Sequence, residues 1–531
     1  MSGKIEKEQE REQKRKLEEK LEKSLLEALH VYAESDFYPL HMPGHKRQIF
    51  EMPMKQFKNP FGIDITEIEG FDNLHHAEGI LKSCMEHAAK VYGTEKTYFL
   101  VNGSSCGILA AVSACTAPGQ SFLMARNCHK SVYHGVFLRN LKAEYIYPQI
   151  FEKLWIQGGI LADSVDNCLT QMEERGNCPS AVLIVSPTYD GLVSDVRGIA
   201  EAVHRHGSIL IVDEAHGAHF PFSFAFPESA ISMGADVVIQ SLHKTLPSMT
   251  QTAVLHVCSD RVDLGMLEYF LQIYQSSSPS YVFMAAMDTC IRYMERSGEK
   301  KLEELRKNLD WFYERVQHLR KIQVIRGQRE LVEKCGIVDV DCSKILIYMG
   351  KTGKNGAWLA DRMREEYHME LEMVQEQYGL ALMSLMDTKR GFERLAAALC
   401  ELDAEILKEE KEEKQGSDVG LRKQYEENGC KGEEWYPEEK VTAGTEIATA
   451  EIVCTIQEAV YSKKRCILWK DALGEISGEF VYVYPPGIPI LAPGERISEN
   501  ILNQVRKAAL AGLPLQGMRD REGRQIEVID R

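Results

Sequence analysis

The sequence lacks the features that define several large classes of protein. It has no apolar stretch near the roughly 18 to 20 residues that cross a bilayer, and its first residues are charged, unlike a secretory leader. None of the 14 cysteines belongs to a C-x-x-C pair, and most lie among apolar residues. We therefore expect a cytoplasmic protein with reduced thiols, no disulfide framework, no membrane partner and no metal site.

The chain also has no excess of basic residues over acidic ones. The 63 Lys and Arg residues are outnumbered by 79 Asp and Glu residues, which gives a formal net charge of −16. Nucleic acids and anionic membranes attract basic surfaces, so neither is expected as the main partner. A cationic small substrate is compatible with this balance, although net charge alone does not identify one.

The 531 residues are enough for two to four domains, and the sequence pattern changes along the chain. Residues 1–35 predict a charged helical segment. Residues 36–295 alternate short apolar runs with helix-length segments, which predicts a large α/β domain with a mainly parallel sheet. Residues 296–405 predict a smaller α+β domain, residues 406–440 an acidic linker, and residues 441–531 a C-terminal domain.

Short β-branched or apolar runs predict the individual strands of the large domain. They cover residues 97–101, 121–125, 181–186, 208–213, 236–240 and 253–258. In the smaller domain, the pattern predicts an amphipathic helix over 296–319, a strand over 345–349 and a helix over 391–408. In an open parallel sheet the strands present ligand-binding groups at their carboxyl ends, so the residues that follow these runs are the candidate site.

Polar residues follow several of the predicted strands. Gly103, Ser104 and Ser105 stand between a strand and a helix, where free backbone N–H groups can bind a phosphate. The other strand-end candidates are His129, Asp213, His216, Ser241, His243 and Lys244.

Each candidate has an ordinary structural explanation when taken alone. A Ser pair or an Asp can cap a helix, His129 can be a buried structural histidine, and Lys244 can be a surface lysine. An ammonium group is costly to desolvate, however. A lysine at the end of a buried strand therefore suggests that its nitrogen takes part in a reaction. The occurrence of all these groups at predicted strand ends favours one shared site.

Eight segments resemble the Orn/Lys/Arg decarboxylase family of fold-type-I pyridoxal phosphate (PLP) enzymes, in its short form without an N-terminal wing domain. They span nearly the whole chain. They are "LHMPGHK" (40–46), "DITEIEGFDNLHHAEG" (64–79), "NCHKSVYHG" (127–135), "SPTYDGLVSD" (186–195), "VDEAHGAHF" (212–220), "SLHKTL" (241–246), "SSSPSYVFMAAMD" (276–288) and "YPPGIPILAPGE" (484–495).

The resemblance implies a fold-type-I PLP-dependent transferase-like large domain, a smaller α+β domain and a C-terminal decarboxylase domain. It implies pyridoxal 5'-phosphate as cofactor, bonded to Lys244 as a Schiff base. Asp213 is expected beside the pyridine nitrogen, His129 stacked on the ring, and His216 close to the cofactor. The implied phosphate-binding residues are Gly103, Ser104, Ser105, Ser241 and His243.

The implied reaction removes the α-carboxylate of arginine, lysine or ornithine, which gives CO2 and agmatine, cadaverine or putrescine for polyamine metabolism. A proton then returns to Cα from Lys244 or His243. The short architecture favours arginine or lysine slightly. An acidic residue should meet the cationic substrate, and the candidates of the 64–79 loop are Glu67, Glu69, Asp72 and Glu78.

The resemblance also implies a homodimer or higher homo-oligomer, in which residues 276–281 reach the active site of the neighbouring copy. Residues 40–46 are expected at the substrate entrance. Two rival functions stay open from the sequence. One is another PLP reaction on the same scaffold, such as transamination, and the other is a non-catalytic binding protein that has kept the fold.

Overall fold

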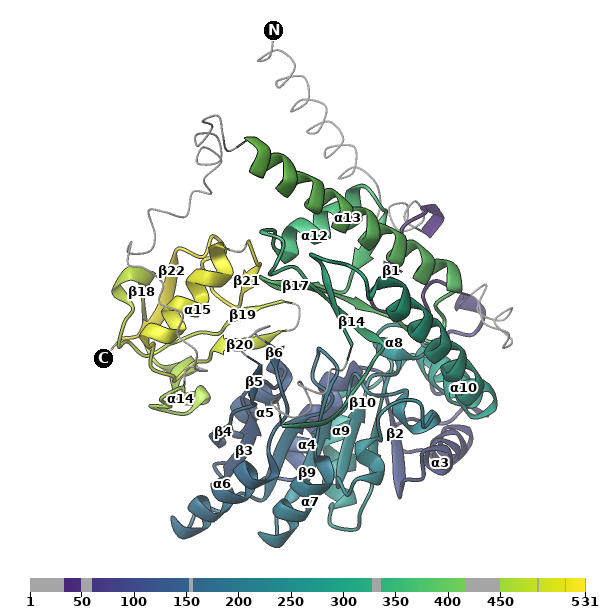
Figure 1. Cartoon of the computed structure of the whole chain (residues 1–531). Coiled ribbons are helices and arrows are strands. Elements are labelled where there is room, and N and C mark those ends of the chain that lie inside the picture. Colours follow the sequence, from purple (N-terminus) through teal and green to yellow (C-terminus); the bar gives the residue numbers. More distant parts are fainter. Residues whose placement is uncertain are drawn as a thin grey trace.

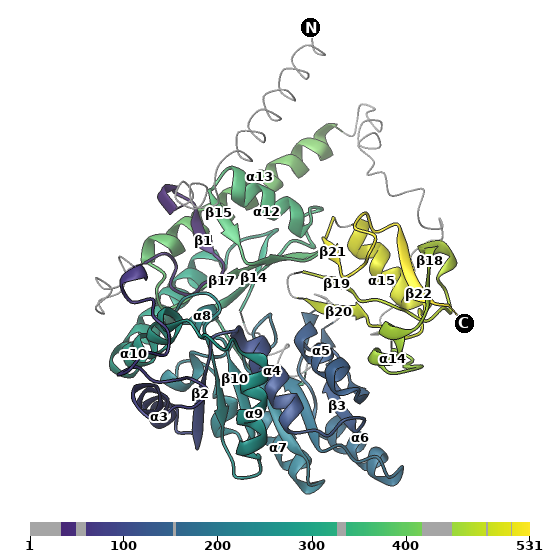
Figure 2. The ribbon, with the colours of Figure 1, turned by 180° about the vertical axis from the view of Figure 1, so that it is seen from behind.

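The structure is a computed structural model that describes residues 33–48, 60–151, 156–326, 336–416, 449–484, 487–510 and 512–530. Most of the predicted segment 1–35 and of the predicted linker 406–440 lies outside these residues. Figure 1 shows a large domain with a smaller domain above it, and the C-terminal domain beside both. The same arrangement is seen from behind in Figure 2.

The large domain is built on a seven-stranded sheet. Its order is β2 (Lys96–Leu100), β11 (Ala253–Val257), β10 (Val237–Gln240), β9 (Ile209–Asp213), β7 (Ala181–Val185), β3 (Ser121–Ala125) and β4 (Lys142–Ile146). Strand β11 is antiparallel to both of its neighbours, and the remaining six strands run in one direction. The predicted mainly parallel sheet is confirmed, with each predicted strand within one residue of the observed one.

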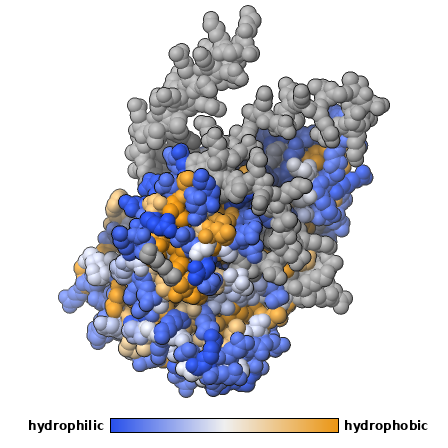
Figure 3. Space-filling model, turned by 90° about the vertical axis from the view of Figure 1, so that its left-hand side faces the viewer, coloured by the Kyte–Doolittle hydropathy of each residue, from blue (hydrophilic) through white to orange (hydrophobic). Residues whose placement is uncertain are grey.

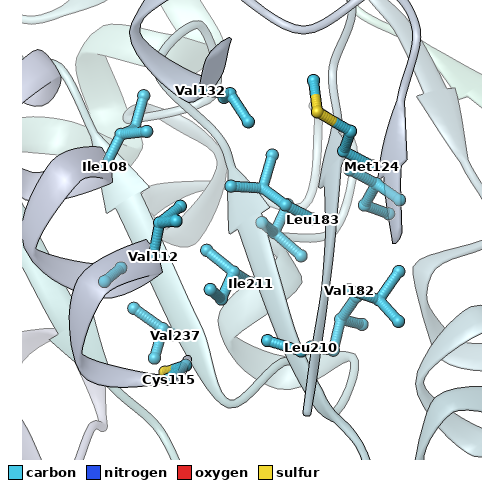
Figure 4. Packing of buried hydrophobic residues seen from close by; sticks show 14 of the residues in the cluster. Ile108, Val112, Cys115, Met124, Val132, Val182, Leu183, Leu210, Ile211 and Val237 are labelled. Carbon is cyan, nitrogen blue, oxygen red and sulfur yellow. The ribbon is translucent and has the colours of Figure 1, made fainter. Parts of the chain in front are cut away.

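Helices pack on this sheet through apolar side chains. Helix α4 (Gly103–Ala114) contacts α5 (Lys130–Arg139) and α9 (Leu264–Tyr274), while α6 (Ala162–Glu174) packs against α7 (Val196–Arg205). Figure 4 shows Ile108 and Val112 of α4 facing Ile211 and Val237 of the sheet, and all four are fully or almost fully buried. This packing fixes the carboxyl ends of the strands in space.

The remaining elements of the large domain are short, apart from α3. They are η2 (Pro60–Gly62), α3 (Ile80–Tyr92), β5 (Ile150–Phe151), β6 (Ile156–Gln157), β8 (Leu192–Ser194), η3 (Phe220–Phe222), η4 (Ala230–Ser232) and α8 (Leu242–Thr245).

The smaller domain begins on a long helix, α10 (Tyr281–Val316). The helix predicted to start at residue 296 therefore begins earlier, where the Ser280 side chain caps it. The predicted domain boundary at 295/296 falls within this continuous helix, and the division into domains stays a prediction.

The sheet of the smaller domain is antiparallel, with the order β12 (Gln323–Ile325), β14 (Lys344–Tyr348), β17 (Tyr378–Leu382) and β16 (Met373–Val374). Helices α12 (Gly356–Glu365) and α13 (Lys389–Gly416) belong to the same domain. Two pairings connect this domain to distant parts of the chain. Strand β1 (Tyr38–Leu40) pairs with β15 (Met369–Leu371), and β8 pairs with β13 (Ile337–Val340).

The C-terminal domain has a small core of its own. Its elements are α14 (Ile456–Tyr461), β18 (Lys464–Leu468), η5 (Trp469–Asp471), β19 (Val481–Val483), β20 (Ile488–Leu491), α15 (Glu499–Leu510), β21 (Leu515–Gln516) and β22 (Gln525–Ile529). Strand β19 lies between β20 and β21, and β18 pairs with β22. Trp469, Leu491 and Ile526 are among the buried residues that fill the space between these strands and α15.

A buried arginine connects this domain to the central sheet. Arg126 follows β3, and its guanidinium donates to the carbonyl oxygens of Pro489 at 2.7 Å and Ile490 at 3.0 Å. The same group lies 3.2 Å from a carboxylate oxygen of Glu495, and both side chains are almost fully buried. The C-terminal domain is thereby held against the carboxyl end of β3.

Within the described chain, no helix is long and apolar enough to cross a membrane, and the cysteines are free. The same residues contain no group of three His, Cys, Asp or Glu side chains that could hold a metal ion. On the face shown in Figure 3, hydrophilic side chains surround scattered hydrophobic groups.

Arg126→Met should lower the free energy of unfolding by about 3 to 5 kcal/mol, because Glu495 would keep a buried and unpaired charge. Adding Glu495→Gln to Arg126→Met should recover part of the loss, since no buried charge then stays unpaired. Urea unfolding followed by circular dichroism measures both variants. Equal losses in the single and the double variant would contradict an ion-pair contribution.

Candidate active site

The strand-end residues converge on one cavity of about 440 Å³. Strands β2, β3, β7, β9 and β10 run in the same direction, so the residues that follow them meet at one edge of the sheet. Eight of the nine predicted site residues line the cavity: Gly103, Ser104, Ser105, His129, Asp213, His216, His243 and Lys244. The ninth, Ser241, is fully buried at the end of β10, directly before α8.

Lys244 and Asp213 occupy neighbouring strand ends. Asp213 is the last residue of β9 and pairs with Ile239 of β10, and Lys244 lies in α8 immediately after β10. Burial lowers the pKa of Lys244, and the charges of Asp213 and Glu372 partly offset this effect. Burial also raises the pKa of Asp213, which the charge of Lys244 opposes. The cavity therefore favours a neutral amine at Lys244.

His216 contacts two lysines at once. Its Nε2 lies 3.0 Å from Lys244 Nζ, and its Nδ1 lies 3.1 Å from Lys344 Nζ. The ring is 5% exposed, and its centroid is 4.5 Å from that of the Tyr189 ring. Burial, followed by the charges of the two lysines, holds the pKa of His216 well below its usual range, so the imidazole is neutral.

His129 and His243 are neutral for the same reason. Burial lowers the pKa of His129 to about 3 and that of His243 to about 4. His129 Nδ1 accepts from the backbone N–H of Ser131 at 3.2 Å, and this bond caps α5. His243 Nδ1 lies 2.9 Å from the carbonyl oxygen of Thr252, so Nδ1 donates and Nε2 keeps a lone pair.

The first turn of α4 has the properties of a phosphate-binding site. Gly103 has a φ of +76°, a conformation that favours glycine, and places the helix start at the cavity. Ser104 and Ser105 add hydroxyl groups to the free N–H groups of this turn. Ser241 Oγ and Asn127 Oδ1 are buried without a hydrogen-bond partner among the described residues, which fits a bound polar ligand.

Several cavity residues were not found from the sequence because they come from other parts of the fold. Tyr378 of β17 lines the cavity, and its hydroxyl donates to Asp190 at 2.8 Å. Tyr484 and Ile488 of the C-terminal domain also line the cavity, and the Gly487 carbonyl accepts from Lys130 N at 3.1 Å. The C-terminal domain therefore completes the wall near His129.

Lys344 was missed as well, although a signal was present. It is the first residue of β14 and is 2% exposed, so it repeats the pattern of a lysine beside a buried strand that drew attention to Lys244. Glu372, another missed residue, accepts hydrogen bonds from the Tyr189 hydroxyl and from Met42 N.

The carboxylates of the 64–79 loop do not line this cavity. Asp72 instead accepts backbone hydrogen bonds from Gly79 at 2.7 Å and Leu81 at 3.1 Å, and so supports the start of α3. The loop packs beside residues 276–281, where His75 Nε2 lies 2.8 Å from the carbonyl oxygen of Ser276.

Segment 40–46 contacts the lysine-bearing turn. Met42 lines the cavity, and Gly44 N donates to the carbonyl oxygen of His243 at 2.7 Å. A Cβ atom at Gly44 would lie 2.7 Å from the carbonyl carbon of Thr245, so only glycine fits here without a shift of this backbone. Lys46 is buried and donates to the carbonyl oxygens of His41 and Leu382.

Comparisons with known proteins agree with this architecture. The family models of the Orn/Lys/Arg decarboxylase major domain and C-terminal domain match residues 23–346 and 446–509. An arginine decarboxylase of Bacillus anthracis is 30% identical over 508 residues, which cover 95% of this chain and 97% of the relative. The solved constitutive lysine decarboxylase of Escherichia coli has a TM-score of 0.71 at 19% identity, over 95% of this chain and 81% of that one.

A solved alanine–glyoxylate aminotransferase from Nostoc shares the fold with a TM-score of 0.52 at 14% identity. The match covers 69% of this chain and 95% of the aminotransferase. The predicted fold class is thus confirmed. Since the family models match both the major and the C-terminal domain, the chain belongs to the Orn/Lys/Arg decarboxylase family.

Proposed function

We propose that the protein is a PLP-dependent decarboxylase that converts a basic L-amino acid to CO2 and the corresponding amine. The observation that carries the proposal is the placement of Lys244 and Asp213 in one cavity, beside the free first turn of α4. An amine whose pKa is lowered by burial, a buried carboxylate and a phosphate-binding turn are the three groups that PLP requires.

Different residues of the cavity would hold different parts of the cofactor. Lys244 Nζ would bond its aldehyde, and the Asp213 carboxylate would hold a proton at its ring nitrogen. The phosphate would lie at Gly103, Ser104 and Ser105, with Ser241 and His243 beside it. His129 would stack on the ring, and the hydrogen bond from Ser131 N to Nδ1 helps to orient the imidazole.

When bound, PLP supplies an electron sink that accepts the electron pair of the Cα–carboxylate bond as CO2 leaves. The chain itself orients the substrate and limits water. Met42, Met373 and Ile488 give the cavity apolar walls, which favour the loss of a charged carboxylate. Lys244 or His243 then returns a proton to Cα, and both side chains line the cavity.

The charges near the cavity suit a cationic substrate. Asp190 lines the cavity, and burial raises its pKa to about 6. Glu372 lies behind Tyr189 and adds a second carboxylate. Arginine is the first substrate to test, because the matched Bacillus anthracis relative is named an arginine decarboxylase.

An aminotransferase on the same scaffold is less well supported. The matched aminotransferase covers 69% of this chain, whereas the C-terminal decarboxylase domain matches residues 446–509. Tyr484 and Ile488 of this region line the cavity, so the additional domain is part of the site. A pure binding protein would have no need of a lysine at this position.

We also propose a homodimer or higher homo-oligomer with shared active sites, which residues 64–79 and 276–281 would help to build. These segments pack together through His75 and Ser276, and the adjoining surface exposes Phe71, Ile80 and Ile273. Exposed apolar groups of this kind mark association surfaces. The cytoplasmic location stays a prediction from the sequence.

Lys244→Ala should abolish the visible absorption band of the bound cofactor and reduce decarboxylation by several orders of magnitude, because no other amine lines the cavity within the described chain. The measurement is an absorption spectrum after addition of PLP, together with CO2 release from arginine, lysine and ornithine. Lys351→Ala, at an exposed lysine, is the matched control. Retention of band and activity in Lys244→Ala would refute the assignment, and a keto-acid product without CO2 would favour the aminotransferase.

Phe71→Asp should weaken the dimer, because a carboxylate would be buried in the proposed apolar contact. Light scattering after size-exclusion chromatography should give about twice the chain mass for the unaltered protein and a lower mass for the variant. Leu473→Asp, at an exposed leucine of the C-terminal domain, is the control and should leave the mass unchanged. A monomeric unaltered protein would contradict the proposal.

A further inference from the structure

The two hydrogen bonds of His216 restrict the charges of its neighbours. A neutral imidazole carries one N–H donor and one lone pair, and an ammonium group can only donate. If Lys344 is charged, Nδ1 must accept from it. Nε2 then carries the proton and donates to Lys244 Nζ, which must be a neutral amine. With both bonds formed, the two lysines can hold at most one ammonium charge.

The carboxylates near each lysine decide where this charge lies. Although burial raises it, the pKa of Asp341 is held below its usual value by His219, by Lys344 and by a hydrogen bond from Ser343, so Asp341 is ionised. The pKa of Asp213, beside Lys244, is instead raised by burial. The ammonium is therefore more stable on Lys344.

Burial lowers the pKa of Lys344 to about 8, and the charges of Asp341 and Glu372 oppose this effect. At neutral pH the side chain is thus mostly charged but able to release a proton. Lys344 does not line the cavity, and its hydrogen bond to His216 connects it to the cavity residue Lys244. The titratable and charged groups that face Lys244, His216 and Lys344 are Lys46, His129, Tyr189, Asp190, Asp213, His243, Asp341 and Glu372.

The surroundings hold the Lys344 side chain in this position. Gly191 has a φ of +90°, and a Cβ atom there would lie 2.7 Å from Lys344 Cγ. The hydrogen bonds of His216 place Lys344, a lysine of the smaller domain, close to Lys244 at the edge of the central sheet, and Figures 1 and 2 show the smaller domain above this sheet. Such packing leaves little freedom to break the contact with His216.

We propose that Lys344 is a positioning residue that sets the protonation state of Lys244 through His216. While Lys344 is charged, Lys244 is held as the neutral amine that can bond an aldehyde. When one proton moves from Lys344 Nζ to His216 Nδ1 and another from His216 Nε2 to Lys244 Nζ, the charge passes to Lys244. No proton is gained or lost. This inference rests on the proposed function, because the bonding lysine is Lys244.

The test compares the pH dependence of cofactor bonding in full-length protein freed of PLP. The visible band that appears after PLP is added gives the rate constant at each pH. In Lys344→Met, His216 Nδ1 no longer has to accept from an ammonium group. His216 Nε2 can then accept from a charged Lys244, so the pKa of Lys244 rises. The midpoint of the pH profile should then move up by about one pH unit. Lys344→Arg keeps the charge and should leave the midpoint unchanged or lower.

A control variant separates this inference from simpler explanations. Lys351→Met removes an exposed charge near β14 and should not move the midpoint. A purely structural role for Lys344 would impair the Met and the Arg variant alike, without an upward midpoint shift that occurs in Lys344→Met alone, and that result would overturn the inference. If the unaltered protein forms no band at all, the proposed function itself fails.

Neutron diffraction from crystals of the unaltered PLP-free protein keeps the inference testable if the variants do not fold. Near neutral pH it should show deuterium on His216 Nε2, none on Nδ1, three deuterons on Lys344 Nζ and two on Lys244 Nζ. Deuterium on Nδ1, or three deuterons on Lys244, would overturn the assignment.

Discussion

The desolvation of amines and carboxylates at the edge of the central sheet is the constraint on which the rest of the site depends. Lys244 and Asp213 lie at adjacent strand ends, and burial disfavours the charged form of each. Because water does not solvate these groups fully, each charge must be stabilised by a partner in the protein, or the group takes its neutral form. The surrounding residues can be understood as the means of meeting that requirement.

Three parts of the chain contribute to this balance. The large domain supplies the strand ends and the first turn of α4, which provides donors for an anion. The smaller domain brings Lys344 to His216, so that one charge is shared between two lysines. The C-terminal domain, held by Arg126, places Tyr484 and Ile488 on the cavity wall. Docking of this domain is therefore a condition for a complete site.

The sequence predicted the sheet and the candidate residues well for a physical reason. Parallel strands end at the same edge, so polar residues that follow apolar runs must meet, as Asp213 and Lys244 do. The same reasoning failed where contacts join distant segments. Nothing local in the sequence shows that Lys344 of β14 reaches His216, that Tyr378 reaches Asp190, or that α10 runs unbroken through residue 296. The 64–79 carboxylates lie outside the cavity because the loop packs on α3 and residues 276–281.

The central claim is that Lys244, rather than its neighbours Lys344 and Lys46, bonds the cofactor. Reduction of the PLP-loaded protein with borohydride, followed by proteolysis and mass spectrometry, tests it directly. We predict a reduced phosphopyridoxyl group on the peptide that contains Lys244. Attachment to Lys344 or Lys46, or no attachment to any lysine, would contradict the account.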